Sequence, residues 1–220
     1  MAAKKNSRAP RIDAIRLDGL TDGDPALLSP NENVFGERFS GADLSGLDLS
    51  GASFTECEFL DLLAHEADLR GTSFADTRFE RLNAPIFAAP RSRFRDVSIE
   101  ASRIGSAEFF DANWQSVHLA NCKLGYVNLR GARLNDVLFT DCTIDELDLG
   151  DATATRVAFA GTRIGTLDVT RSILSEVDLR ALEVSQIVTL EGLRGAIMTP
   201  YQITELATVL AQQFGIVVED

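Results

Sequence analysis

The stretch Phe39 to Phe54 reads FSGADLSGLDLSGASF, and its large apolar residues are spaced by five. They fall at Phe39, Leu44, Leu49 and Phe54. An α-helix repeats every ~3.6 residues and a strand every two, so neither continuous element keeps these positions on one face. Each five-residue unit is therefore expected to hold a short extended piece followed by a corner.

This five-residue register continues from Val34 to Val184 without a break. All 31 positions are Leu, Ile, Val, Phe, Trp or Ala, in a chain that is 45% hydrophobic. A run of this kind has a chance probability of roughly 10^-11, so the repeat outweighs local secondary-structure signals.

Similar residues also recur every twenty positions, which indicates four units in each coil. Valine shows this spacing at Val97, Val117, Val137, Val157 and Val177. The sequence thus predicts a mainly β fold, a quadrilateral parallel β-helix whose coils stack at the strand spacing of about 4.8 Å. Just under eight coils are expected, with a length of roughly 37 Å.

The two ends of the chain depart from the repeat, and we expect three segments: residues 1–33, 34–190 and 191–220. Residues 11–33 are expected to cover the first coil. The stretch TPYQITELATVLAQQFG predicts a helix with Thr199 as N-cap, Pro200 as first residue, Gln202 in a capping box and Gly215 at the end. Its apolar stripe consists of Ile203, Leu206, Ala207, Leu210 and Phe214.

This C-terminal helix has more apolar surface than one stripe needs. One interpretation is that it only covers the exposed edge of the last coil. The other is that it also joins two chains into a homodimer. The predicted dimerisation residues are Tyr201, Leu206, Val209, Leu210 and Phe214.

Composition limits the function classes. The net charge of −12 and the pI of about 4.6 argue against a surface for nucleic acid or for anionic membranes. The start, MAAKKNSRAPR, lacks the apolar run of a signal peptide, and no stretch has the length of a membrane span. Three cysteines without paired spacing fit a reduced, cytoplasmic protein.

No catalytic or metal-binding constellation can be assembled from the register, so we expect neither an enzyme nor a cofactor. The two histidines, His65 and His118, fall on different sides of the square and are expected at the solvated surface. Cys122 and Cys142 are one coil apart, which is within reach of a disulfide. Two buried thiols in a column of small residues is the favoured interpretation.

Acidic residues form columns on the outer surface. The first column contains Glu56, Asp76, Asp96, Asp136 and Glu176, interrupted by Ser116 and Arg156. The second contains Asp48, Asp68, Glu108, Asp148 and Asp168. We predict that the first column, with Asp148 and Asp168, binds a basic partner. Alternatively, Asp suits a position beside a corner because its side chain bonds nearby backbone. A basic column, Arg103, Lys123 and Arg163, weakens the first interpretation.

The motif Ala-Asp-Leu occurs at residues 42–44 and 67–69, with Gly at 41, 46, 51, 71 and 131. In these residues the chain resembles the pentapeptide-repeat proteins over about 150 positions. The resemblance implies a right-handed quadrilateral β-helix. It also implies a possible function, because the best-understood members resemble double-stranded DNA in shape and charge. Those members bind DNA gyrase or topoisomerase IV and affect fluoroquinolone sensitivity.

The leading prediction is therefore a non-enzymatic interaction protein, a DNA mimic that acts on a type II topoisomerase and binds no nucleic acid or membrane itself. The alternative is a structural or scaffolding solenoid with another protein partner. The unbroken register leaves no room for the inserted loops on which some topoisomerase-protecting members depend. The resemblance leaves loop-free dimeric members as a model.

Overall fold

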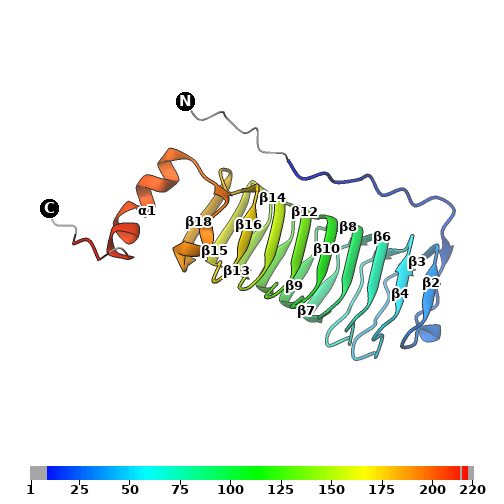
Figure 1. Cartoon of the computed structure of the whole chain (residues 1–220). Helices are drawn as coiled ribbons and strands as arrows, with labels where there is room; N and C mark the ends of the chain where they lie inside the picture. The colour runs from blue at the N-terminus through cyan, green and yellow to red at the C-terminus, as the bar shows by residue number, and fades with distance from the viewer. Residues whose placement is uncertain (1–8, 214, 218–220) are drawn as a thin grey trace.

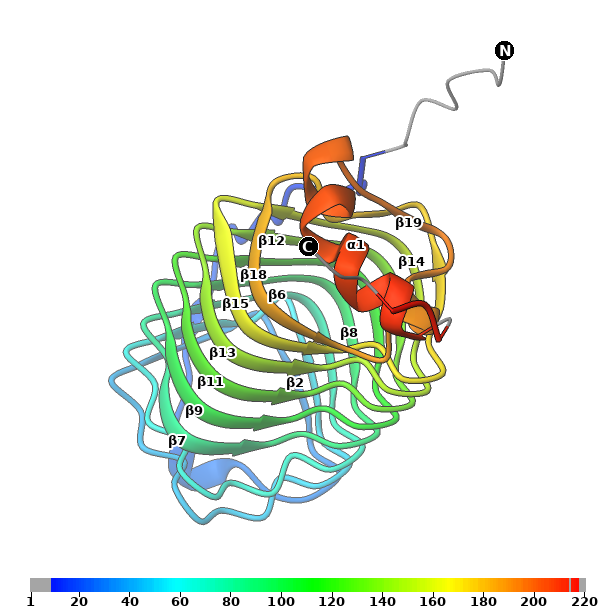
Figure 2. The ribbon, with the colours of Figure 1, turned by 90° about the vertical axis from the view of Figure 1, so that its left-hand side faces the viewer.

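The computed structural model describes residues 9–213 and 215–217, which form a parallel β-solenoid of about nine turns and one C-terminal helix. Figure 1 shows an elongated stack of coils, with the helix at one end and an extended N-terminal segment along one edge. Viewed from the helix end in Figure 2, the coils lie one behind another around a common interior. The predicted fold class is confirmed.

Two parallel sheets build the walls. The larger sheet contains thirteen strands: β1 (Thr21–Asp22), β2 (Asn33–Phe35), β3 (Glu37–Ser40), β4 (Ser53–Thr55), β5 (Glu58–Leu60), β6 (Ser73–Glu80), β8 (Arg93–Glu100), β10 (Asn113–Ala120), β12 (Arg133–Thr140), β14 (Thr153–Ala160), β16 (Ile173–Ser175), β17 (Val177–Asp178) and β19 (Ala196–Ile197). The smaller sheet contains six: β7 (Asn83–Ala88), β9 (Arg103–Glu108), β11 (Lys123–Asn128), β13 (Thr143–Asp148), β15 (Thr162–Asp168) and β18 (Leu182–Val188). Three helices complete the described chain: η1 (Pro25–Leu27), η2 (Leu190–Leu193) and α1 (Pro200–Gln213).

The strand register confirms a coil of twenty residues. Phe54 pairs with Phe74, and Val127 pairs with Leu147, each one coil further along the chain. Every pairing from β2 to β18 has this offset. Because like positions stack, a residue type that suits one coil suits the next.

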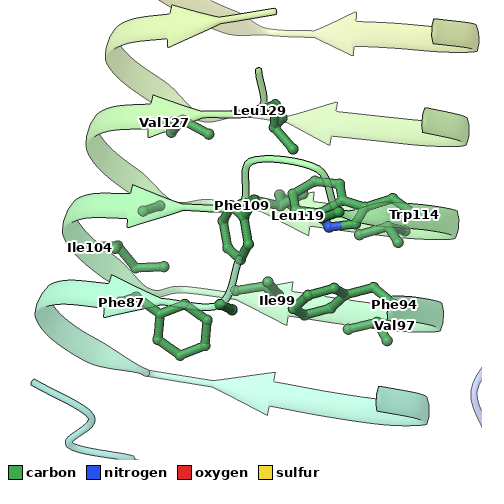
Figure 3. Close-up of a cluster of buried hydrophobic side chains, with 14 of the residues drawn as sticks. Phe87, Phe94, Val97, Ile99, Ile104, Phe109, Trp114, Leu119, Val127 and Leu129 are labelled. Atoms are coloured by element: carbon green, nitrogen blue, oxygen red, sulfur yellow. The ribbon is translucent and has the colours of Figure 1, made fainter. Parts of the chain in front are cut away.

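The five-residue register forms the core. Of its 31 positions, all but the partly buried Val184 are buried. Phe39, Phe59 and Phe79 stack face to face, with ring centroids 5.1 and 4.9 Å apart. Figure 3 shows the next coils, where Phe94 and Trp114 project into the same interior. Burial of each large apolar side chain stabilises the fold by about 1.5–3 kcal/mol.

The solenoid is longer than the sequence predicts because both ends add strand pairs. Thr21 in β1 pairs with Glu37, and Ala196 in β19 pairs with Val177. The number of turns is therefore about nine rather than just under eight. The sheet also reaches Ile197, so residues 191–197 continue the solenoid and are not part of a helical cap.

The N-terminal segment differs from the prediction. Only its later part lies at the first coil, where Thr21 N–H donates to Gly36 O at 2.9 Å. Residues 9–20 leave the end and follow the side of the rod (Figure 1). We call residues 9–20 the strap.

The C-terminal helix α1 begins and ends as predicted. Thr199 N–H donates to Gln202 Oε1 at 2.9 Å, and Gln202 N–H donates to Thr199 Oγ1 at 3.1 Å, which is a capping box. At the other end, Gly215 has a φ of 71°, and Ile216 N–H donates to Ala211 O at 2.9 Å. This bond spans the five residues typical of a Schellman motif.

Candidate partner-binding surface

The first acidic column occupies a corner of the solenoid. All seven of its residues have positive φ, between 50° and 57°: Glu56, Asp76, Asp96, Ser116, Asp136, Arg156 and Glu176. Asp is one of the few non-glycine residues that enter this left-handed region readily. The backbone alone thus accounts for part of the acidic composition of this column.

Asp136 in this column is not available at the surface. Its side chain accepts two 2.6 Å hydrogen bonds from Arg156, one at each oxygen, and Arg11 N–H donates to Oδ1 at 3.0 Å. The residue is only 3% exposed. The bond from Arg156 holds the pKa of Asp136 below its usual value. Asp136 therefore serves as an internal anchor, in contrast to the predicted role.

The neighbouring member, Ser116, is anchored in the same way. Asp13 N–H donates to Ser116 Oγ at 3.0 Å, and Ser116 is buried. Glu56, Asp76 and Asp96 are half-buried, and Asp76 makes an ion pair with Arg95 at 3.4 Å. Glu176, also half-buried, lies two coils beyond Asp136. These four carboxylates remain predicted partner-binding residues.

The second column follows the alternative interpretation, in which Asp lies beside a corner because its side chain bonds nearby backbone. Asp48, Asp68, Asp148 and Asp168 each accept a hydrogen bond from the backbone N–H two residues later, at 2.7–3.0 Å. This is the Asx-turn geometry that favours Asp beside corners.

Arg130 neutralises much of the second column. Its Nη2 lies 2.9 Å from Asp148 Oδ2 and 3.5 Å from Asp168 Oδ2, and its Nη1 lies 3.3 Å from Asp151. Asp148 is 5% exposed. Asp148 is therefore withdrawn from any partner surface, and Asp168 is partly screened.

A group of exposed acidic residues lies in the coil of residues 135–151. Asp141, Asp145 and Glu146 are exposed, and within the described chain they form no ion pair. Residues 135–151 contain six carboxylates and no basic residue. We call Asp141, Asp145 and Glu146 the acidic patch.

The basic column borders a shallow groove of the smaller sheet. Arg103 and Lys123 lie beside a depression of about 270 Å³ over Gly105 and Gly125. A Cβ atom at Gly125 would overlap the carbonyl oxygen of Gly105, so the close stacking of these two coils requires glycine at position 125; Asp145 also lines the depression. Arg163 is paired with Glu183 at 2.7 Å. The rod is thus striped by charge and not uniformly acidic.

The predicted dimerisation residues divide into two groups. Tyr201 is 72% exposed, whereas Leu206 and Leu210 are partly buried. The side chain of Val209 and the whole of Phe214 lie outside the described residues. Ile203, which the sequence placed on the covering stripe, is 46% exposed.

The histidines and cysteines form no reactive site. His118 is half-buried and not solvated as expected, because its Nε2 lies 3.0 Å from Thr140 Oγ1; burial lowers its pKa. Cys57, Cys122 and Cys142 are free and buried. In the described part of the chain, no cluster of His, Cys, Asp and Glu could hold a metal ion. None of the described helices is long and apolar enough to cross a bilayer.

Comparison with solved structures finds similar solenoids at low identity. Trypsin-treated QnrB1, a plasmid-mediated fluoroquinolone resistance protein, is 20% identical with a TM-score of 0.36, over 86% of this chain and 91% of that one. Full-length QnrB1 is 18% identical with a TM-score of 0.28, over 89% and 95%. HetL, a regulator of heterocyst differentiation from the cyanobacterium Nostoc sp. strain PCC 7120, is 18% identical with a TM-score of 0.28, over 77% and 90%. These scores are too low to support a functional argument.

Family models give the clearer result. A model of the pentapeptide repeat region matches residues 112–187, and a model of eight pentapeptide repeats matches residues 38–62. No curated protein matches the sequence. With the twenty-residue coil and the filled five-residue register, these matches show that the chain belongs to the pentapeptide-repeat proteins.

Proposed function

We propose that this protein is a non-enzymatic, cytoplasmic interaction protein that offers carboxylates to the basic DNA-binding groove of a type II topoisomerase, DNA gyrase or topoisomerase IV. The supporting observation is the acidic patch, Asp141, Asp145 and Glu146, exposed on one coil of a chain with a net charge of −12. Such a protein would reduce fluoroquinolone sensitivity by occupying the enzyme.

The charge geometry supports imitation of DNA only in part. Corner carboxylates such as Asp76 and Asp96 repeat at the coil spacing of about 4.8 Å. One DNA strand carries a phosphate about every 3.4 Å along the helix axis. The rod therefore matches the sign and the direction of a phosphate row at a lower charge density, and the acidic patch raises that density locally.

We further propose that the active form is a homodimer joined through α1. The apolar side chains of Tyr201 and Ile203 are exposed, and Ile216 and Val217 after the helix are 56% and 78% exposed. Two rods of about nine turns, joined end to end, would span roughly 80–90 Å. A two-fold dimer is the commonest closed assembly.

Binding to purified DNA gyrase tests the proposal. We expect wild-type protein to bind at ~0.1 M salt and to lose most binding near ~1 M salt, where charges are screened within about 3 Å. The triple variant Asp141→Asn, Asp145→Asn, Glu146→Gln should bind much more weakly. The triple variant Asp22→Asn, Glu66→Gln, Glu191→Gln removes three exposed carboxylates outside the acidic patch and α1, and it is the matched control.

Supercoiling provides the decisive readout. Wild-type protein in molar excess should inhibit gyrase supercoiling, and the triple variant should not. An excess of folded wild-type protein that leaves supercoiling unchanged would overturn the topoisomerase proposal.

One observation favours the second candidate, a scaffold for another protein. Arginines one coil away neutralise several exposed carboxylates, as Arg81 does for Asp61 and Arg171 does for Asp151, each at 2.6 Å. A scaffold needs such ladders for rigidity, whereas a DNA mimic loses negative potential through them. Binding that is insensitive to salt would favour the scaffold.

A further inference from the structure

The strap follows one corner of the solenoid over several coils. At its C-terminal side, Thr21 N–H donates to Gly36 O at 2.9 Å. Near its N-terminal side, Arg11 N–H donates to Asp136 Oδ1 at 3.0 Å. Gly36 and Asp136 belong to the same corner column, five coils apart. The strap therefore runs along this column over roughly 24 Å, as the extended segment in Figure 1 illustrates.

The strap contacts the rod through its apolar side chains. Its partly buried residues are Pro10, Ile12, Ile15, Leu17 and Leu20. Its charged residues Arg11, Asp13, Arg16 and Asp18 are all exposed. The segment thus has one apolar side toward the solenoid and one charged side toward solvent.

The strap is also held by few bonds. Residues 9–20 form no strand pairing with the solenoid, and their two hydrogen bonds to the corner column go to the side chains of Asp136 and Ser116. By contrast, each coil is joined to the next by a ladder of backbone bonds. The strap can therefore detach while the rod stays folded.

We propose that this edge is an exchangeable peptide-docking site, which the strap occupies until an extended segment of a protein partner displaces it. The segment that fits has apolar side chains at the spacing of residues 10–17 and backbone N–H groups for Asp136 and Ser116. This proposal does not depend on the topoisomerase proposal, because it concerns the strap edge and not the acidic patch.

Binding in trans tests the site. The probe is a fluorescein-labelled synthetic peptide of residues 9–20, and the receptor is the full-length double variant Ile12→Asp, Ile15→Asp. We expect the peptide to bind this variant at least about tenfold more tightly than wild type, because the tethered strap competes at high effective concentration. A peptide carrying the same two substitutions is the matched control and should not bind.

Hydrogen exchange of the wild-type protein supplies an independent readout. The amides of Arg11 and Asp13 should be protected in wild type and lose protection in Asp136→Ala. Unprotected amides in wild type would overturn the proposal. A released variant with an unchanged circular dichroism spectrum that fails to bind the peptide would overturn it as well.

Discussion

The two ends of the rod meet the same requirement in different ways. A solenoid exposes apolar side chains and unpaired strand edges at each end. At the N-terminal end, the strap runs along the side of the rod, and the backbone of β1, which follows it, pairs with β3. At the C-terminal end, β19 pairs with β17, and the first turn of α1 then bonds to the last coil through Gln202.

A helix satisfies a strand edge less completely than a strand does. The backbone N–H and C=O groups of α1 are used within the helix, so the coil edge receives side-chain bonds instead. Gln202 Nε2 donates to Leu179 O at 2.7 Å and to Leu182 O at 3.3 Å. Grooves of about 310 and 480 Å³ remain on the two sides of the helix. Both ends expose apolar side chains, Leu27 and Phe35 at the N-terminal end and Tyr201, Ile216 and Val217 at the C-terminal end, but the grooves beside α1 distinguish the C-terminal end.

Removal of α1 should produce the largest effect. Deletion of residues 199–220 exposes the last strand edge and the surface that Leu206 contacts in the full-length protein. We therefore expect a monomer that aggregates. Light scattering on the full-length protein should give a mass of two chains at micromolar concentration. A mass of one chain for the full-length protein would contradict the dimer and leave the helix as a cover only.

The middle of the rod should tolerate loss of packing less well than loss of surface charge. Phe74→Ala removes a buried ring that stacks between Phe54 and Phe94, so we expect a loss of roughly 3–5 kcal/mol in the free energy of unfolding. Arg133→Ala, an exposed change in a nearby coil, should stay within about 0.5 kcal/mol. Equal denaturation midpoints for the two variants would contradict the inward register.

Asp136 accepts a hydrogen bond from the strap and forms an ion pair with Arg156, so the stability of the N-terminal closure depends on a buried charge. Arg156→Ala leaves the buried carboxylate without its main partner and should cost about 1–3 kcal/mol. Arg171→Ala is the matched control, since Arg171 makes the same two 2.6 Å bonds to the exposed Asp151. We expect no measurable loss of stability in the control.

The pH dependence of these variants sharpens this prediction. Arg156 lowers the pKa of Asp136 in the folded protein. The pair therefore stabilises the fold above the ordinary Asp pKa of about 3.9, and this stabilisation is lost as the pH falls below it. Arg156→Ala should lose less stability than wild type between pH 6 and pH 3. An equal loss in both would contradict the role of the pair.

Much of the fold could be predicted because the repeat places residues by counting. The twenty-residue coil follows from valines such as Val117 and Val137, and the same arithmetic places Arg156 one coil from Asp136. That ion pair could have been read from the columns, although we expected a free carboxylate. The capping box of α1 is a local signal and was confirmed by its hydrogen bonds.

The strap could not be predicted in the same way. Its apolar residues Ile12, Ile15, Leu17 and Leu20 have irregular spacing and no counterpart in the repeat. Their position depends on where the chain turns before β1, which no local pattern specifies. His118 was misplaced for a similar reason, because an outward position in the repeat is half-buried here.

The smallest effect is expected between the two ends, at the stacked cysteines. Cys122 Sγ lies 3.3 Å from Ile99 O, and Cys142 Sγ lies 3.5 Å from Leu119 O, so each thiol donates to the carbonyl of the preceding coil. The pKa of Cys122 is raised mainly by its interaction with Cys142 and, to a smaller extent, by burial. The raised pKa keeps this thiol protonated and unreactive. Cys57, equally buried and bonded to Val34 O at 3.8 Å, has no cysteine above it and is the internal control.

We expect a thiol reagent to label none of the three in the folded protein and all three after unfolding without reductant. If only Cys57 were labelled and the intact mass were lower by about two hydrogens, Cys122 and Cys142 would be bridged. A disulfide would then join two neighbouring coils covalently in the middle of the rod, and the two coils could not separate completely when the rod unfolds.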